Sequence, residues 1–363
     1  MSKALHLIYG DDPFSMTTQL CQKVNLAQHI HHNDHVVLKP NLVTPSCASL
    51  GATTHPEIVE ALIIYLKEHS IRRISIVESS WIGAKTEDAF ASHNYYDLQK
   101  KYDIELVDVK KDQYVTLESD GFSIEYSKTA YEADYFINLP VLKGHLQTKM
   151  TCALKNLKGV ISDRSKRDFH RWDLDSPIAT LYTLKKPNAI IVDSINGDLD
   201  FEEGGNPVQT NRMFIGFDSL LVDSFGASLM GYEKDEIRHV AIAISQDPNY
   251  APLKEGDIIK LNEDTVHTRY VPSQKVKHLE KYTVANQACS ACYGNLIHAL
   301  ARLEERGILR DLNQKIHIGQ GFKESVACGL GVGTCTKNFT RSVSGCPPTT
   351  IDILNYLKRH IEG

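Results

Sequence analysis

Cysteine spacing in the last quarter of the chain constrains the fold more than any other feature of the sequence. Five of the eight cysteines lie between residues 288 and 348. Cys289 and Cys292 form a C-x-x-C pair, and the other three, each within two residues of a glycine, are Cys328, Cys335 and Cys346. Thiolates that bind one centre must converge, and glycine allows the backbone to approach closely. The pattern predicts a metal centre in this part of the chain.

Several kinds of cysteine site fit such a pattern. A structural zinc site usually needs two close cysteine pairs, or one pair and two histidines, whereas this segment contains one C-x-x-C. A cubane [4Fe–4S] cluster accepts ligands from separate loops, which suits the wider spacing. Disulfides are disfavoured because we expect no leader peptide, so the thiols should stay reduced. An iron–sulfur cluster is the leading interpretation, with zinc and buried or redox-active thiols as alternatives.

Two helices are expected to begin at the cysteines. The C-x-x-C precedes an apolar stripe of helical spacing over residues 293–306, and a C-terminal helix is predicted to begin at Cys346, with prolines in its first turn. Helix N-termini stabilise anionic thiolates. We leave out Cys328, because the remaining thiols lie in more constrained turns. The predicted ligands are Cys289, Cys292, Cys335 and Cys346.

Length and charge exclude some classes of protein. The 363 residues suffice for one large or two medium domains. The net charge of −5 excludes a generally basic nucleic-acid-binding protein, and no apolar run reaches the length of a membrane span. We therefore expect a cytoplasmic protein that binds neither nucleic acid nor membrane. The histidine-rich residues 29–35 are expected to form a solvated loop.

The order of strands and helices predicts an α/β fold with a mostly parallel sheet flanked by helices. A helix at 56–69 connects two strands, which implies parallel pairing. The domain boundary is placed near residue 275, so that residues 1–275 form the α/β domain and residues 276–363 a smaller cysteine-rich α/β module. Helices are also expected at 150–157 and, after an Asp218 N-cap, at 220–229. The main buried strands are predicted at 36–38, 74–77, 135–139 and 189–193.

Polar residues follow these strands, and ligands of open α/β sheets bind at the carboxyl edge. The cations there suit a small anionic metabolite with a carboxylate or phosphate group, although lysines at helix ends are often only surface residues. Glu78 and Asp193 are expected to pair with these cations. The predicted catalytic residues are Lys39, His55, Lys143 and His145, and the predicted substrate-binding residues are Asn41, Lys149, Lys155 and Asn156.

Several short motifs resemble one family of prokaryotic proteins. They are Lys39-Pro40-Asn41, Thr54-His55-Pro56, Lys143-Gly144-His145, the Leu154–Gly159 segment and Gly345-Cys346-Pro347-Pro348. Together, over most of the chain, they resemble the family called domain of unknown function 362. The resemblance implies an iron–sulfur-associated protein and a fold similar in outline to the α/β lobe of nickel-dependent lactate racemase. Many members carry a dense four-cysteine insert of the ferredoxin type, whereas this chain has the sparser set described above.

These expectations combine into an iron–sulfur oxidoreductase as the leading hypothesis. One [4Fe–4S] cluster would take electrons from a redox partner such as ferredoxin and deliver them to a small anionic metabolite. Lys39, Lys143 and His145 would hold or protonate that metabolite, with His55 as an acid–base partner and Asn41 orienting it. One alternative is an electron-transfer or accessory protein without its own substrate. Another is a non-redox enzyme with zinc in the thiol site.

Overall fold

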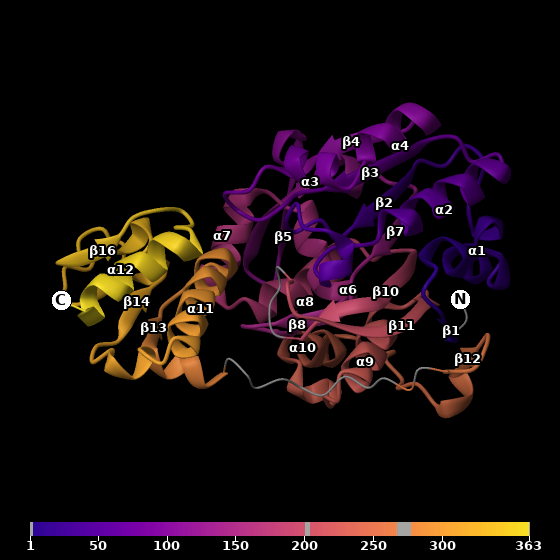
Figure 1. Ribbon diagram of the computed structural model, residues 1–363. Coiled ribbons are helices and arrows are strands. Elements are labelled where there is room, and N and C mark those ends of the chain that lie inside the picture. The colour runs from indigo at the N-terminus through magenta and orange to yellow at the C-terminus, as the bar shows by residue number, and fades with distance from the viewer. Residues whose placement is uncertain (1–2, 200–203, 266, 268–276, 363) are drawn as a thin grey trace. The chain divides into compact units, whose positions relative to one another are not determined.

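The computed structural model describes residues 3–199, 204–265, 267 and 277–362 (Figure 1). The chain divides into two compact units. The large unit comprises Met1–Ser80, Ala84–Lys166 and Asp175–Pro272, and the small unit comprises Trp81–Gly83, Arg167–Leu174 and Ser273–Gly363. Two short internal segments thus belong to the small unit, which the sequence had not indicated. The boundary predicted at residue 275 lies outside the described residues.

The large unit contains an eight-stranded sheet in the order β12-β1-β11-β10-β7-β2-β3-β4. Strands β10, β7, β2, β3 and β4 are parallel, whereas β11 is antiparallel to both β1 and β10. This confirms the predicted α/β class and its mostly parallel sheet. The strand bounds are β1 Leu5–Tyr9, β2 Val36–Pro40, β3 Ile74–Glu78, β4 Glu105–Asp108, β7 Tyr135–Leu139, β10 Ala189–Asp198, β11 Pro207–Gly216 and β12 Ile258–Lys260.

Helices cover the central strands, whose residues are buried on both faces. Such burial is why these strands are continuous apolar runs. Helices α1, α2 and α4 form one core with alternate residues of β2, β3, β7 and β10. The predicted helix at 56–69 and the Asp218 N-cap are both confirmed. The helix bounds are α1 Pro13–Lys23, α2 Pro56–Glu68, α3 Thr86–Ser92, α4 Tyr95–Tyr102, α5 Lys128–Tyr131, α6 Ala153–Asn156, α7 Asp163–Trp172, α8 Asp175–Leu184, α9 Ser219–Leu229 and α10 Arg238–Gln246.

Two hairpins leave the main sheet. One pairs β5 (Tyr114–Ser119) with β6 (Phe122–Ser127), and the other pairs β8 (Lys143–His145) with β9 (Lys149–Thr151). The helix predicted at 150–157 is therefore wrong in its first residues. Helix α6 begins only at Ala153, where the carboxylate of Asp223 accepts the backbone N–H groups of Ala153 and Leu154 at 2.6 and 3.1 Å. A distant residue thus sets where this helix starts.

The small unit has a four-stranded parallel sheet in the order β13-β14-β15-β16 and two helices that contact each other. The C-terminal helix was predicted to begin at Cys346, but it begins at Thr350. The hydroxyl of Thr349 accepts the N–H of Asp352 at 3.1 Å and so caps the helix, a role that cysteine fills poorly. The bounds are β13 Thr283–Ala285, β14 Ile316–Ile318, β15 Leu330–Val332, β16 Arg341–Val343, α11 Ser290–Glu305 and α12 Thr350–Glu362.

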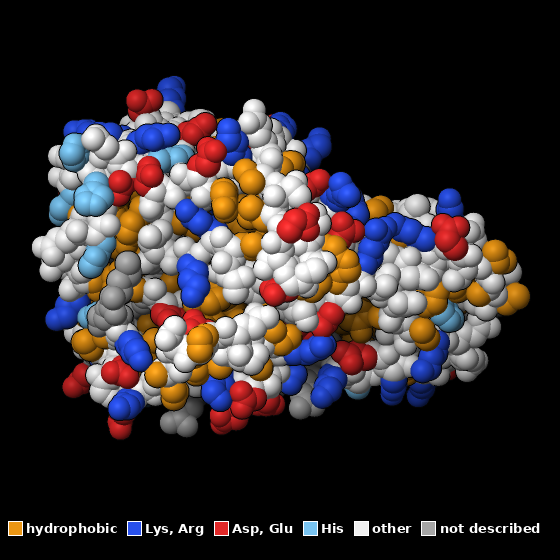
Figure 2. All heavy atoms as spheres, turned by 180° about the vertical axis from the view of Figure 1, so that it is seen from behind, with side chains coloured by type: hydrophobic (Ala, Val, Ile, Leu, Met, Phe, Trp, Pro, Cys, Tyr) orange, Lys and Arg blue, Asp and Glu red, His pale blue; other side chains and the backbone are white. Residues whose placement is uncertain are grey.

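The surface carries intermixed charges of both signs, with histidines gathered at one edge of the view in Figure 2. Within the histidine-rich stretch, His29, His31 and His32 are exposed, as predicted for a solvated loop. His35 differs, because it is buried and its Nε2 lies 2.8 Å from the hydroxyl of Ser75. No helix in the described part of the chain is both long enough and apolar enough to cross a bilayer.

Candidate functional site

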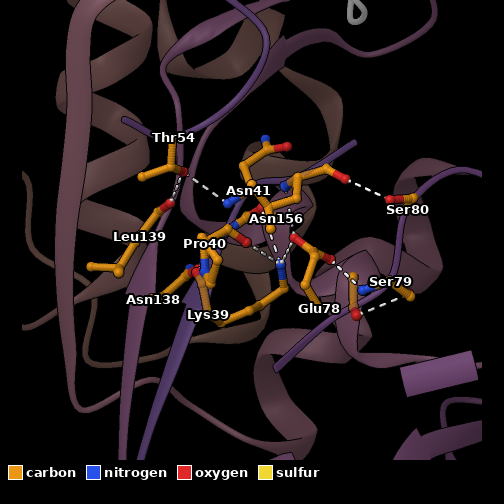
Figure 3. A network of polar contacts seen from close by, with 12 residues as sticks. Lys39, Pro40, Asn41, Thr54, Glu78, Ser79, Ser80, Asn138, Leu139 and Asn156 are labelled. Atoms are coloured by element: carbon orange, nitrogen blue, oxygen red, sulfur yellow. Dashed lines mark hydrogen bonds and ion pairs between the residues drawn. The ribbon is translucent and has the colours of Figure 1, made fainter. Parts of the chain in front are cut away.

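A buried ion pair occupies the carboxyl edge of the large sheet (Figure 3). The Nζ of Lys39, at the end of β2, lies 2.8 Å from Oε2 of Glu78, at the end of β3, and the two side chains are 0 and 3 % exposed. The same ammonium donates to the carbonyl of Pro40 at 2.9 Å and to Oδ1 of Asn156 at 3.3 Å. Burial lowers the pKa of Lys39, and Glu78 opposes that shift. Three acceptors match the three N–H groups of a charged lysine.

The carboxylate of Glu78 is equally well satisfied. Its Oε2 also accepts the N–H of Leu42 at 3.0 Å, and its Oε1 accepts the N–H of Ser79 at 2.7 Å. The carboxamide of Asn156 donates to Oδ1 of Asn138 at 2.8 Å and extends the network to β7. The ion-pair role expected for Glu78 is confirmed. The anion-binding role of Lys39 stays a prediction, and its ammonium already has three internal acceptors.

His55 forms the second polar pair at this edge. Its Nδ1 lies 2.7 Å from Oδ2 of Asp193 on β10, and its backbone N–H donates to the same oxygen at 2.9 Å. Burial alone lowers the pKa of His55, but the charge and hydrogen bond of Asp193 outweigh burial and raise the pKa to about 9. The imidazole is 14 % exposed, whereas Asp193 is fully buried. The pairing expected for Asp193 is confirmed, and it holds a protonated imidazole near the surface.

The other predicted pocket residues have separate surroundings. Lys143 is fully buried and donates to the carbonyl of Ala52 at 2.6 Å. Nδ1 of His145 accepts the backbone N–H groups of residues 147 and 148 and so stabilises the turn of the β8–β9 hairpin. Lys149 is exposed, with its Nζ 3.8 Å from a carboxylate oxygen of Glu236. Lys155 and Asn41 are buried. The structure brings Lys39 and Asn156 together and gives the rest different partners.

Lys166 is a further buried lysine, and no sequence pattern predicted its burial. The Nζ of Lys166 lies 2.6 Å from Oγ of Ser79 and 3.0 Å from the carbonyl of Ser80. Burial lowers the pKa of Lys166 to about 8, although the charge of Asp163 opposes the shift. Lys166 lies in a polar stretch, so nothing in the sequence separates it from surface lysines. It anchors the segment that follows β3.

The four cysteines predicted as ligands line one pocket of the small unit. Cys289 and Cys292 lie at the start of α11, and Cys335 and Cys346 follow β15 and β16. Burial raises the pKa of the Cys292 thiol, and the charges of the other three cysteines add to that rise. These thiols therefore lie within electrostatic range of one another, although they come from three segments far apart in the sequence.

Glycines make room around the thiols. Gly333 lines the pocket, and a Cβ atom at this position would lie 3.6 Å from Sγ of Cys292. Gly345 has a φ of +142°, and a Cβ atom there would come within 2.4 Å of Pro348. The sequence expectation that glycine permits close backbone approach holds at these two positions.

A carboxamide beside the thiols was not predicted. Nε2 of Gln320, which follows β14, lies 3.7 Å from Sγ of Cys289 and donates to the carbonyl of Arg167 at 2.9 Å. Its Oε1 accepts the Nε–H of Arg171 at 3.1 Å, which fixes the amide nitrogen toward the sulfur. Lys323, Arg171 and Arg167 also place positive charge near Cys335. This charge opposes the rise that burial causes in the pKa of the Cys335 thiol. The setting of Gln320 between two glycines was the only sequence signal for this residue.

Cys328 belongs elsewhere in the small unit. It is exposed and lines a different pocket, together with Lys315 and Arg341. The ligand set that leaves it out stays a prediction, and the geometry separates Cys328 from the pocket that the other four thiols share.

Comparison with known proteins gives the family. Residues 36–228 match the model described as a domain of unknown function, DUF362, which is more than half of the chain. The chain belongs to the DUF362 family. The match agrees with the motifs of the large unit and ends before the cysteine-rich segment, so it does not itself show an iron–sulfur site.

Individual proteins that resemble this DUF362 chain share about a third of their residues with it or fewer, over part of its length. The thylakoid-associated protein sll1697 of Synechocystis sp. is 32% identical over 157 residues, which is 43% of this chain and 48% of that protein, so this chain spans about half of its length. The lactate racemase apoprotein of Thermoanaerobacterium thermosaccharolyticum is 16% identical, with a TM-score of 0.41, over 64% of this chain and 57% of that one. A protein from Thermotoga maritima is 13% identical, with a TM-score of 0.39, over 65% of this chain and 59% of that protein.

Replacing Gly159 by alanine should break the Lys39–Glu78 pair. The new Cβ would lie 1.9 Å from Oε1 of Glu78 and 2.5 Å from Nζ of Lys39, so both groups must move. A separated buried ion pair costs about 3–5 kcal/mol, and the free energy of unfolding in urea should fall by that amount. Gly256→Ala is the matched control, because nothing lies within 4 Å of its Cβ position. Equal stability of the two variants would contradict this account.

The His55–Asp193 pair should make stability depend on pH. The folded pKa of about 9 exceeds the unfolded value of 6.5, so the pair stabilises fully below pH 6.5 and loses its effect as the pH rises through 9. Wild type should lose up to about 3 kcal/mol across this range, as measured by urea unfolding, and His55→Gln should lack this loss. His32→Gln, on the exposed turn, should behave as wild type. An unchanged pH slope in His55→Gln would refute the coupling.

Proposed function

We propose that the small unit holds one [4Fe–4S] cluster through Cys289, Cys292, Cys335 and Cys346, and that the protein transfers electrons through it. The observation that carries this proposal is the single pocket that all four thiols line. Cubane clusters commonly take their ligands from separate loops. A cluster bound there accepts and releases one electron at a time.

The surroundings of the thiols suit an anionic cluster. No Asp or Glu is among the described residues that line the pocket. The N-terminus of α11 presents backbone amides and the positive end of the helix dipole to the first two thiols. Arg167, Arg171 and Lys323 add positive charge near Cys335. Each of these groups stabilises thiolates and the negative charge that iron–sulfur clusters usually carry.

The position of the thiols on separate segments suits a cluster better than a single zinc ion. Zinc needs all of its sulfur ligands about 2.3 Å from one point. Within residues 3–199, 204–265 and 277–362, no three His, Cys, Asp or Glu side chains form a group that could hold one metal ion. A cubane cluster offers a separate iron to each thiolate, so its ligands surround a larger body. Zinc remains the alternative, and metal analysis distinguishes the two.

A second candidate function adds the reduction of a small anionic metabolite in the large unit. The His55–Asp193 pair favours it, because a protonated imidazole at the carboxyl edge could supply a proton to a substrate that receives electrons. Lys39 supports it less than the sequence predicted, since its ammonium has internal acceptors. In both versions electrons would come from a redox partner such as ferredoxin, and a cytoplasmic location would keep the thiols reduced.

Iron analysis tests the cluster directly. Protein purified without oxygen should contain about four iron and four sulfide per chain and give a paramagnetic resonance signal after reduction. Cys292→Ala should lose most of both, because the Cys292 thiol is largely buried and interacts electrostatically with the other three thiols. Cys328→Ala removes a thiol of the same unit from a different pocket and should keep them. Zinc without iron would support the non-redox alternative, and iron loss in the Cys328 variant would overturn the ligand set.

Gln320 should tune the reduction potential. Its amide donates toward Sγ of Cys289, and hydrogen bonds to sulfur favour the reduced, more negative cluster. Gln320→Leu removes the donor with little change of volume and should lower the midpoint potential in a redox titration, while the iron content stays the same. Gln314→Leu, in the other pocket, should leave the potential unchanged. A potential that does not move in Gln320→Leu would rule out this role.

A further inference from the structure

A second pocket lies at the opposite edge of the small sheet. Ile316 pairs with Leu330, which in turn pairs with Arg341, so the residues just before the three strands are neighbours. These include Lys315 and Gly329, which line the pocket. The four predicted ligands do not line it. Because β14, β15 and β16 are three residues long, the two edges are separated by about 10 Å.

The charge of this second pocket is positive. Lys315 and Arg341 are exposed side chains that flank β15, and neither has a hydrogen bond or ion pair with any residue that the structure describes. The described lining residues include no Asp or Glu. Like charges on the two sides of β15 repel each other, and an anion between them relieves that repulsion.

His317 lies in the wall of the pocket. Its ring packs against Phe322 and Phe339, with centroid distances of 5.4 and 5.2 Å. Its Nδ1 is buried and has no hydrogen-bond partner among the described residues. A Cβ atom on Gly329 would lie 3.6 Å from this nitrogen, so the nitrogen faces the backbone that lines the pocket. The two phenylalanine rings and the glycine backbone thus hold His317 in place as part of the pocket wall.

We propose that this pocket binds a small molecule through a phosphate or carboxylate group. Arg341 and Lys315 supply charge-assisted hydrogen bonds. Thr340 accepts the N–H of Gly329 at 3.3 Å and keeps its own proton to donate. The pocket has a volume of about 510 Å³ and opens to solvent, which is within the size of small-molecule sites. The site is separate from the proposed cluster and does not depend on it.

The exposed thiol of Cys328, in the same pocket, reports on binding. Its alkylation rate is measured by peptide mass spectrometry on the full chain with inorganic phosphate or citrate, each against chloride at equal ionic strength. One or both anions should slow the reaction at millimolar concentration, while Cys47, exposed in the large unit, reacts as before. Arg341→Ala and Lys315→Ala should each weaken protection about tenfold or more. Arg310→Ala, exposed in the same unit outside the pocket, should not.

Each outcome decides the proposal. Protection by phosphate alone assigns a phosphate-bearing ligand, and protection by citrate alone assigns a carboxylate-bearing one. Protection no greater than with chloride, or equal protection in the Arg341→Ala and Lys315→Ala double variant, overturns the site. Calorimetric titration of the protective anion into Cys328→Ser must still show binding heat, and its absence also overturns the site. These readouts do not require iron, so a failure of the cluster proposal remains distinguishable.

Discussion

The buried ion pair between Lys39 and Glu78 is the constraint on which the large unit depends. Two charges that are almost fully removed from water are stable only when their hydrogen-bonding capacity is met, and here the ammonium and the carboxylate each have three partners. The partners come from the ends of β2 and β3 and from the segment after β9. Any displacement of these segments leaves a buried charge unpaired. The network therefore fixes the carboxyl edge of the sheet.

Both units use the same property of parallel sheets and reach different results. Strand ends converge at the carboxyl edge, so side chains that follow different strands come close together. In the large unit the converging groups are charges, and they mostly satisfy one another, with the His55–Asp193 pair nearest to solvent. In the small unit they are thiols, and they surround a pocket. This contrast is why the proposed chemistry centres on the small unit.

Local sequence signals were sufficient for the main elements. The helix at 56–68 follows from its proline and its apolar spacing, and α9 follows from its aspartate cap. These signals were insufficient where a residue far away in the sequence determines the local structure. The β8–β9 hairpin takes up the first residues of the predicted helix, and the late start of α6 depends on Asp223, far along the chain. The C-terminal helix begins at Thr350 because a threonine, rather than Cys346, caps it.

The sequence by itself determined the α/β class, the family and the choice of cysteines worth testing, because periodicity, motifs and thiol spacing are local properties. Only the tertiary structure decided which polar groups meet. Lys39 and Glu78 are 39 residues apart and become partners, whereas Lys39 and Lys149 carry the same charge and have separate surroundings. Strand order and register place residues next to one another in space. Neither can be read from a single strand, because both depend on how distant segments pack together.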